Sequence, residues 1–198
     1  MSALTLPSFT AATPPPRKRF SRDEVESMLD AGLFAGQRFE LIDGDLIDKM
    51  GQKPPHAFAI HLLLAWLAKG FGGERVRGQS PIEAGSQDRE HSLPEPDLAV
   101  LIEPNAEFRR RHPRGDELLL VLEVADTTVR YDATTKRDLY ARAGVPEYWV
   151  LDIPGRRIIA HRKLTAGRFE EIIAFSDGEI VAPAGRPDLT LAVAECLP

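Results

Sequence analysis

Continuous and alternating apolar runs predict a core of β-strands in the second half of the chain. Two runs are apolar on both faces, as is typical of central strands: DLAVLI, which begins at Asp97, and ELLLVLEV, which contains Glu123. EYWVLDI predicts a third strand, and RRIIAHRKL with RFEEIIAF predicts a hairpin that turns at residues 165–167. Shorter strands are expected within ERVRGQSPIEA, GEIVAP and LTLAV.

A helix and a hairpin are predicted ahead of these strands. Ser21 and Glu24 match a capping box, and apolar residues follow at helical spacing, so a short helix should start here and end near Gly32. The string RFELIDGDLIDKM predicts two strands around the turn Asp43–Gly44. Glu40 lies in the first of them, and alternation puts it on the same side as Ile42. An exposed strand carboxylate is still the favoured interpretation, because glutamate is seldom buried.

The segment HAFAIHLLLAWLAKGFGG is apolar nearly all round, which predicts a helix buried on several sides. His61 is interpreted as a core residue, because a histidine in an apolar helix is more often structural than a ligand. The pattern assigns no role to His56, which stands at the start of this helix.

A second helix is predicted after the ELLLVLEV strand. Asp132 should cap it, and it should run to about residue 143 and stop at Gly144. Lys136 is open to two interpretations: its side chain points inward, or its stem packs on the core while its amine reaches solvent. The residues that share the apolar face of Lys136, at spacings i+3, i+4 and i+7, are Leu139, Tyr140 and Ala143.

Asp97, Glu123 and Lys136 form the candidate site. Burying an ionised carboxylate without a partner is costly, so carboxylates on buried strands are normally paired with a cation or a metal. Two carboxylates at adjacent strand ends supply hard oxygen ligands for Mg²⁺ or Mn²⁺, and the main-chain carbonyl of Val124 could add another. Such an ion can activate water and stabilise charge on a phosphate, while an inward lysine orients or deprotonates the water.

Composition narrows the class of protein. The 198 residues suit one domain, predicted over 20–198, with a flexible arm over 1–19. The net charge of -5 does not by itself point to a nucleic-acid binder, although a groove can be locally basic on an acidic protein. A single cysteine, Cys196, excludes an internal disulfide and fits a reducing compartment. The chain has no apolar run long enough to span a membrane and no signal-peptide order at its start, so a cytoplasmic location is expected.

Two basic segments have alternative interpretations. The loop at residues 105–117 carries four arginines and His112, which either face solvent or contact phosphate. The basic cluster at residues 17–19 is either a solvated tail or a second phosphate contact.

Several of these strings occur together in a known family. FELIDGDLID, PEPDLAVL and LLLVLEVADTTVRYDATTKRDLYARAGVPEYWVLD resemble, in order, the Uma-two family of endonucleases, a branch of the restriction-endonuclease-like PD-(D/E)xK superfamily. The resemblance covers roughly residues 21–174. It implies an α/β (α+β) fold, with a restriction-endonuclease-like mixed β-sheet core flanked by helices and additional β-hairpins, and a metal-dependent nuclease site.

The resemblance also implies roles for single residues. Asp97 matches the aspartate of the superfamily's PD motif, and Glu123 matches its second carboxylate. The superfamily lysine would fall at Ala125, but the family takes it from the following helix, where Lys136 stands. Glu40 matches an early family glutamate, which reverses the preference for an exposed residue.

Two further matches lie at the edge of the predicted site. His56 matches a family histidine and is assigned to the periphery of the site. Tyr140 and the EYW string match as well, and they are interpreted as packing residues around the helix.

The leading hypothesis is a Mg²⁺- or Mn²⁺-dependent endonuclease that hydrolyses DNA phosphodiester bonds. Its metal ligands would be Asp97, Glu123 and Val124, with Lys136 and Glu40 as further catalytic residues. A homodimer is compatible with this, because many such nucleases cut two strands with two subunits. The alternatives are a catalytically silent nuclease-fold module that binds nucleic acid or a protein, and a hydrolase of a smaller phosphate ester. On the leading hypothesis, Lys136→Ala should lose activity with little loss of stability.

Overall fold

A computed structural model describes residues 17–49 and 53–198 of the chain. Most of the predicted N-terminal arm therefore lies outside the described residues. Lys18 donates a hydrogen bond to Glu24 at 2.7 Å, and Arg19 forms an ion pair with Asp43. These two basic residues thus lie against acidic side chains of the domain.

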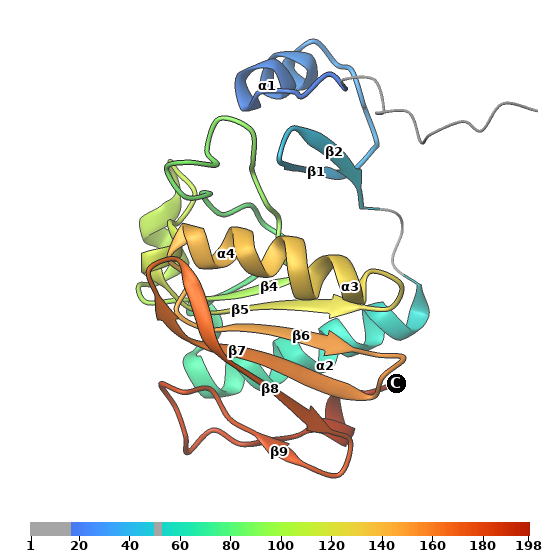
Figure 1. Ribbon diagram of the computed structural model, residues 1–198, viewed down its shortest axis with the longest axis vertical. Coiled ribbons are helices and arrows are strands. Elements are labelled where there is room, and N and C mark those ends of the chain that lie inside the picture. Colours follow the sequence, from blue (N-terminus) through green and yellow to red (C-terminus); the bar gives the residue numbers. More distant parts are fainter. Residues whose placement is uncertain (1–16, 50–52) are drawn as a thin grey trace, which may run out of the picture.

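The centre of the protein is a six-stranded mixed sheet (Figure 1), which confirms the predicted fold class. The strand order is β3-β4-β5-β6-β7-β8, and neighbours run antiparallel except the parallel pair β5 and β6. The strands span Val76–Gly78 (β3), Leu98–Leu101 (β4), Leu118–Ala125 (β5), Tyr148–Asp152 (β6), Arg157–Thr165 (β7) and Arg168–Ser176 (β8).

Three of the predicted strands are shorter than the strings that predicted them. The strand expected in ERVRGQSPIEA is limited to the three residues of β3, because residues 73–75 form a 3₁₀ turn. The short strands expected near the C-terminus are present as β9 (Ile180–Val181) and β10 (Leu191–Ala192). They pair with each other in a separate sheet.

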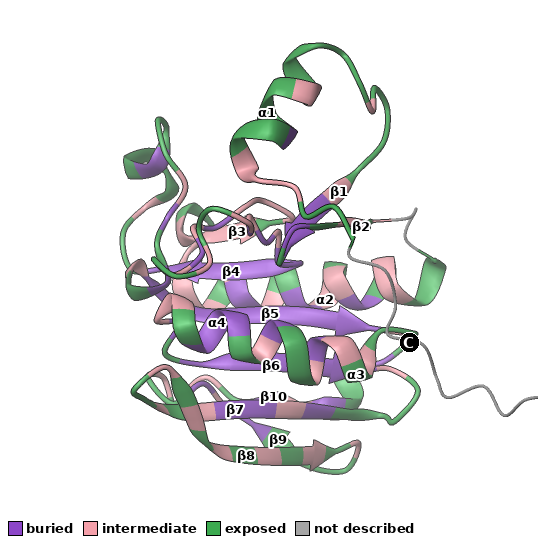
Figure 2. Ribbon diagram, turned by 45° about the horizontal axis from the view of Figure 1, so that its top comes forward, coloured by how far each residue is buried: buried purple, intermediate pink, exposed green. Residues whose placement is uncertain are grey.

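Helices cover both faces of the sheet (Figure 2). Helix α2 (Pro54–Phe71) lies on one face, and the segment from α3 (Val129–Tyr131) to α4 (Arg137–Ala143) lies on the other. Successive strand residues alternate between these layers, so Leu122 packs toward α2 while Val121 packs toward α4. The same alternation turns Glu123 toward the α3–α4 segment.

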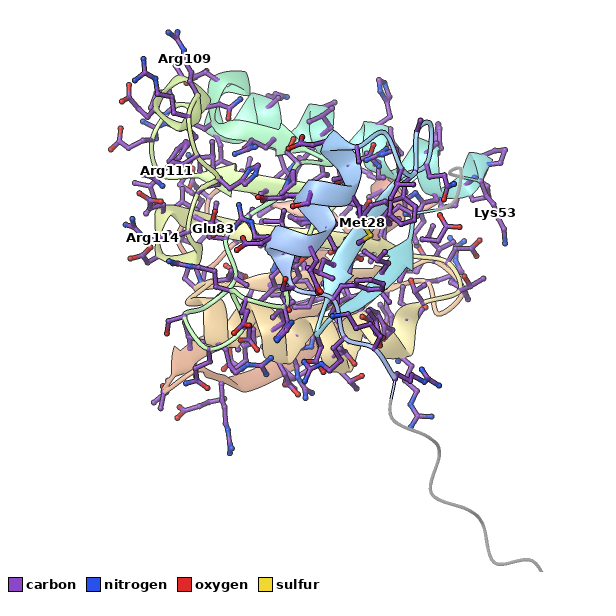
Figure 3. All side chains as sticks on the ribbon, turned by 90° about the horizontal axis from the view of Figure 1, so that it is seen from above. Met28, Lys53, Glu83, Arg109, Arg111 and Arg114 are labelled. Carbon is purple, nitrogen blue, oxygen red and sulfur yellow. The ribbon has the colours of Figure 1, made fainter. Side chains whose placement is uncertain are left out.

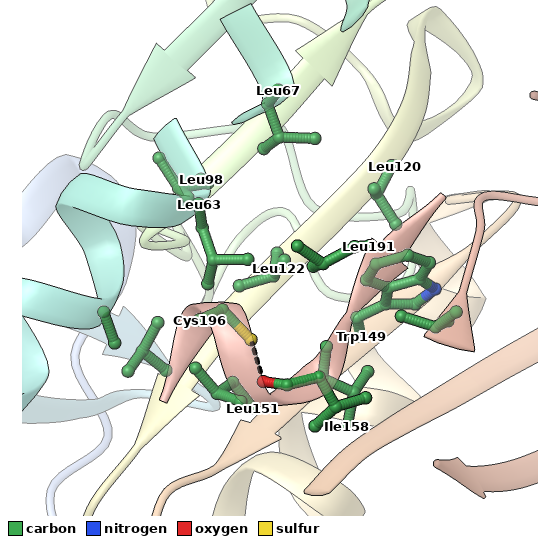
Figure 4. Close-up of a cluster of buried hydrophobic side chains, with 14 of the residues drawn as sticks. Leu63, Leu67, Leu98, Leu120, Leu122, Trp149, Leu151, Ile158, Leu191 and Cys196 are labelled. Carbon is green, nitrogen blue, oxygen red and sulfur yellow. Dashed lines mark hydrogen bonds between the residues drawn. The ribbon is translucent and has the colours of Figure 1, made fainter. Parts of the chain in front are cut away.

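The layer beneath α2 is an apolar core that also holds the single cysteine (Figure 4). The thiol of Cys196 donates to the carbonyl oxygen of Val193 at 3.1 Å, and burial raises the pKa of this thiol to about 12. Cys196 is therefore a protonated core residue. Other members of the cluster are Leu63, Leu67, Leu98, Leu120, Leu122, Trp149, Leu151 and Ile158.

Helix α2 is buried along one face and not on several sides. Ala59, Leu63 and Leu67 are its fully buried residues, whereas Phe58 is about half exposed. His61 is exposed as well, so the prediction that it belongs to the core is wrong. Apolar composition overstated the burial because it does not tell which faces the neighbours cover. Among the described helices, none is long and apolar enough to cross a bilayer.

The helical segment after β5 begins earlier than predicted. Asp132 is not its N-cap, because α3 precedes it and Asp132 opens a π-helical turn that ends at Lys136. The hydroxyl of Thr128 donates to the Asp132 carboxylate at 2.6 Å. The C-terminal end agrees with the prediction, since Gly144 adopts a left-handed conformation with φ of 90° and caps α4.

A small N-terminal unit, helix α1 (Arg22–Asp30) and the hairpin of β1 (Phe39–Ile42) and β2 (Asp45–Asp48), lies beside the β3–β4 edge of the sheet (Figure 2). The predicted capping box and hairpin are both present. The turn needs left-handed backbone at Asp43 and Gly44, with φ of 51° and 81°.

Candidate active site

Asp97 and Glu123 meet across the antiparallel pair β4 and β5. Asp97 directly precedes β4, whose Leu98 faces Leu122. The N–H of Asp97 donates to Glu123 Oε2 at 3.3 Å, and the N–H of Val124 donates to Asp97 Oδ2 at 2.9 Å. Sheet register alone therefore holds the two carboxylates together.

The α3–α4 segment supplies two donors to the buried carboxylate of Glu123. Lys136 Nζ lies 2.9 Å from Glu123 Oε1, and the hydroxyl of Tyr140 donates to the same oxygen at 2.7 Å. Lys136 and Tyr140 are four residues apart, so they lie on one face of the helical segment. Both are buried, which decides between the two interpretations of Lys136 in favour of an inward side chain.

The hairpin delivers a third carboxylate to the same lysine. Glu40 Oε1 lies 2.7 Å from Lys136 Nζ, and Glu40 Oε2 accepts the N–H of Glu95 at 3.1 Å. Asp132 adds a longer contact, 3.8 Å from Lys136 Nζ. Lys136 is thus surrounded by three carboxylates from three separate segments.

His56 approaches the site from the first turn of α2. Its Nε2 lies 3.3 Å from Asp97 Oδ2. Within the described residues, its buried Nδ1 has no hydrogen-bond partner. Burial opposes the charged form of His56, but the Asp97 carboxylate outweighs burial and raises the pKa of His56 above its usual value.

The pKa values of Asp97 and Glu123 are shifted in opposite directions. Burial tends to raise the pKa of Asp97, but His56, Lys49 and the N–H of Val124 outweigh it and lower the pKa to about 2. For Glu123, burial dominates over the lowering effect of Lys136 and raises the pKa to about 8. Burial of the ammonium opposes its charged form, yet the surrounding carboxylates raise the pKa of Lys136 well above its usual value.

At pH values above about 8, where Glu123 is ionised, the buried charges of the site do not balance. Four buried carboxylates share one buried ammonium, that of Lys136. Unpaired buried charge is unfavourable, so such a cluster is a favourable place for an additional cation. The four carboxylates are those of Glu40, Asp97, Glu123 and Asp132.

All the site residues expected from the sequence lie close together, although their catalytic roles remain predictions. Three participants were missed. Tyr140 was interpreted as packing but hydrogen-bonds Glu123, and its i+4 spacing from Lys136 was the signal that could have found it. Asp132 was interpreted as a helix cap but contacts Lys136. Lys49, at the end of the hairpin, was assigned no role, although its charge lowers the pKa of Asp97.

The basic loop at residues 105–117 pairs largely with its own carboxylates. Arg111 binds Glu117 through two hydrogen bonds of 2.6 Å, and Arg114 contacts Asp116 at 3.1 Å. In Figure 3, Arg109, Arg111 and Arg114 lie on the side of the molecule opposite Lys53. Solvent exposure explains these arginines, and a phosphate contact here stays a prediction.

Tyr140→Phe should lower the free energy of unfolding by about 1.5–3 kcal/mol, the usual contribution of a hydrogen bond to a charged group. The reason is that Glu123 loses a donor inside the core. Tyr148→Phe is the matched control, because the Tyr148 hydroxyl is also buried but donates to a neutral carbonyl oxygen, that of Asp132, at 3.1 Å. Urea unfolding should show the larger loss for Tyr140→Phe, and an equal loss for both would contradict this assignment.

Comparison with known families identifies the family of this chain. A family model for Uma2, described as "Putative restriction endonuclease", matches residues 23–194. The chain belongs to the Uma2 family. This confirms the resemblance drawn from the sequence and places the protein in a restriction-endonuclease-like nuclease family. No curated protein matches the chain.

A solved structure shows the same fold as this Uma2 chain. It is a "putative nuclease belonging to DUF820" from Anabaena variabilis ATCC 29413, with 13% sequence identity and a TM-score of 0.69. The match covers 89% of this chain and 97% of that chain. At this identity the similarity establishes the fold.

The structure places a lysine beside Glu123 although the strand position expected for the superfamily lysine holds an alanine. Ala125 stands where the superfamily lysine would be, and it is buried in an apolar cluster with Tyr140 and Val150. Lys136 reaches Glu123 from the neighbouring helical segment instead. The ammonium therefore still lies against the second carboxylate, although it comes from another element.

Proposed function

We propose that this Uma2 protein is a Mg²⁺- or Mn²⁺-dependent endonuclease that hydrolyses phosphodiester bonds of DNA. The observation that carries the proposal is the pair of buried carboxylates, Asp97 and Glu123, on adjacent strands with Lys136 beside them. The excess of buried carboxyl groups over buried ammonium groups around that lysine supports it.

The residues present fit a hard divalent cation. Asp97, Glu123 and the main-chain carbonyl of Val124 would hold it, with water completing the set. Residues 17–49 and 53–198 contain no group of three His, Cys, Asp or Glu side chains arranged to hold a metal, so main-chain and water oxygens are needed as ligands. When bound, such an ion lowers the pKa of a water and stabilises charge on the phosphate.

The chain itself supplies orientation and charge. Three carboxylates around Lys136 Nζ keep the ammonium protonated, so Lys136 positions Glu123 and Glu40 and does not take a proton from water. The Tyr140 hydroxyl fixes Glu123 in the same way. The N–H of Val124 fixes Asp97. Such preorganisation is the main contribution that a protein makes to phosphoryl-transfer sites.

A second candidate is a nuclease-fold module that binds nucleic acid or a protein without cleaving. The observation in its favour is that Lys136 and Tyr140 both engage Glu123 Oε1, as they would in a closed structural ion cluster.

A cleavage assay separates the two candidates. Purified protein with Mn²⁺ should cut at least one of a set of single-stranded, double-stranded and structured DNA substrates, and RNA and small phosphate esters complete the panel. Intact DNA throughout would favour the second candidate. A homodimer remains a prediction, which light scattering can measure.

Mn²⁺ affinity should rise with pH between about 6 and about 8, by up to about tenfold per pH unit. Glu123 must lose its proton to bind the ion, and burial raises its pKa to about 8, so protons compete below that value. Asp97, with a pKa of about 2, does not compete in this range. Calorimetric titration at three pH values measures the effect. Glu123→Gln should remove the dependence, and a flat profile for the native protein would refute this account of Glu123.

A further inference from the structure

The lysine inside the site is buried, and two of its donors are already taken by carboxylates. An ammonium group has three N–H donors. Around Lys136 Nζ, carboxylate oxygens of Glu40, Glu123 and Asp132 lie at 2.7, 2.9 and 3.8 Å. The side chain is also only 5% exposed. A phosphate could reach Lys136 only by displacing one of these carboxylates, so another cation is needed to contact it.

Lys49 stands at the rim of the same site. It follows β2 directly, and its N–H donates to the carbonyl oxygen of Arg38 across the hairpin at 2.8 Å. Its Nζ donates to the carbonyl oxygen of Glu95, the residue whose N–H holds Glu40. Glu95 thus anchors both hairpin side chains two residues before Asp97.

The charge of Lys49 is felt by both predicted metal ligands. Burial and His56 have the larger effects on the pKa of Asp97, and Lys49 is the next contributor, in the direction that lowers it. Lys49 acts in the same direction on Glu123. Its side chain is partly exposed, and within the described residues no carboxylate lies at ion-pair distance from it. An ammonium so placed lacks an anionic partner.

Other cations are less suited to this position. Lys53, at the start of α2, already pairs with Asp126 at 3.3 Å. Arg109, Arg111 and Arg114 lie on the opposite side of the molecule from Lys53 (Figure 3). The complementary ligand for a partly exposed ammonium beside a carboxylate cluster is a phosphate group.

We propose that Lys49 is a catalytic residue that contacts a backbone phosphate of the nucleic-acid substrate at the mouth of the Asp97–Glu123 site. This inference rests on the proposed nuclease function. It assigns to the hairpin lysine the contact with substrate and leaves to Lys136 the positioning of the carboxylates.

The test compares Lys49→Ala and Lys49→Arg with Lys163→Ala. The control removes the same charge from an exposed ion pair with Glu171 on the β7–β8 hairpin.

Binding of a fluorescent single-stranded DNA is measured in EDTA at salt concentrations from about 50 to about 200 mM, and cleavage is measured with Mn²⁺. Lys49→Ala should reduce the salt slope of log affinity by about 0.7, the value of one lost phosphate contact. It should also reduce kcat/KM by about 10²-fold, as loss of one preorganised donor does. Lys49→Arg should retain most of both, and Lys163→Ala should resemble the native protein.

The two readouts separate the possible outcomes. Lost cleavage with an unchanged salt slope would mean that Lys49 only positions Glu95, and it would overturn the proposed contact. Equal behaviour of Lys49→Ala and Lys163→Ala would overturn it too, as would a native protein that binds no DNA. A native protein whose binding depends on Lys49 but which cuts nothing with Mn²⁺ would leave the contact standing and refute the nuclease function.

Discussion

Lys136→Ala is expected to lower the free energy of unfolding by roughly 3–5 kcal/mol, the usual cost of removing one partner from a buried ion pair. For a protein of this size that corresponds to a fall in Tm of roughly 6–20 °C. The cause is the group of carboxylates around Lys136, which is the one buried ammonium among the residues that the structure describes. This replaces the expectation, drawn from sequence, that the change would spare stability. Thermal unfolding followed by circular dichroism measures it.

Two comparisons make the Lys136 prediction specific. Lys163→Ala removes an exposed lysine and should leave Tm nearly unchanged. Adding Glu40→Gln to Lys136→Ala should recover part of the loss, because it removes one of the uncompensated charges. Mn²⁺ should raise the Tm of Lys136→Ala more than that of the native protein, since the ion replaces missing positive charge. A Tm within a few degrees of the native value would show that the carboxylates are not ionised together.

Asp97→Asn is expected to reduce Mn²⁺-dependent cleavage of DNA by about 10³-fold or more, while the protein stays folded. Asparagine keeps an oxygen that can accept the N–H of Val124, so the β4–β5 junction survives, but the charge needed to bind the cation is gone. Steady-state cleavage rates and a Mn²⁺ titration measure the two effects together. Both should fall in the same variant.

Asp152→Asn is the matched control for Asp97→Asn. Asp152 is equally buried, at 3% exposure, but its carboxylate accepts hydrogen bonds from Arg157 and from the N–H of Gly155. Its loss should lower stability and leave the cleavage rate per folded molecule unchanged. If Asp97→Asn cleaves as fast as Asp152→Asn, the predicted ligand role of Asp97 is wrong, and the silent nuclease-fold module becomes the better account.

The division of work between two lysines follows from where each ammonium lies. Lys136 is enclosed by carboxylates, so its substitution should act mainly on stability. Lys49 is at the rim and anchored by one carbonyl oxygen, so its substitution should act mainly on binding and rate. If the lysine stood on the strand, two residues after the glutamate, that one lysine could both position the carboxylate and contact the substrate. Here Ala125 occupies that position.

Much of the fold could be predicted from local patterns. The apolar runs around Asp97 and Glu123 predicted central strands because a strand buried on both faces needs apolar residues at nearly every position. Helical spacing placed Lys136 on the apolar face for an equally local reason, and the structure then decided that its side chain points inward. Such signals depend on periodicity within one segment, so they predict its secondary structure without knowledge of the segments that pack against it.

Other features depended on which segments pack together, and there the local patterns failed. His61 lies in an apolar helix yet is exposed, because no element among residues 17–49 and 53–198 covers that side of α2. Asp132 is a residue type that often caps helices, but here the helical segment begins before it. Asp132 instead opens a π turn, and it is buried there. A sequence pattern specifies residue type and spacing, whereas burial depends on contacts from elsewhere in the chain.

By itself, the sequence determined the central strands, the helix after them and, through family resemblance, the residues of the Asp97–Glu123 site. Only the tertiary structure decided that the hairpin docks against Glu95, so that Glu40 meets Lys136 and Lys49 reaches the rim. The physical reason is that charge balance in a buried site is set by distances between side chains far apart in sequence. Those distances exist only once the sheet, the helical segment and the hairpin have packed together.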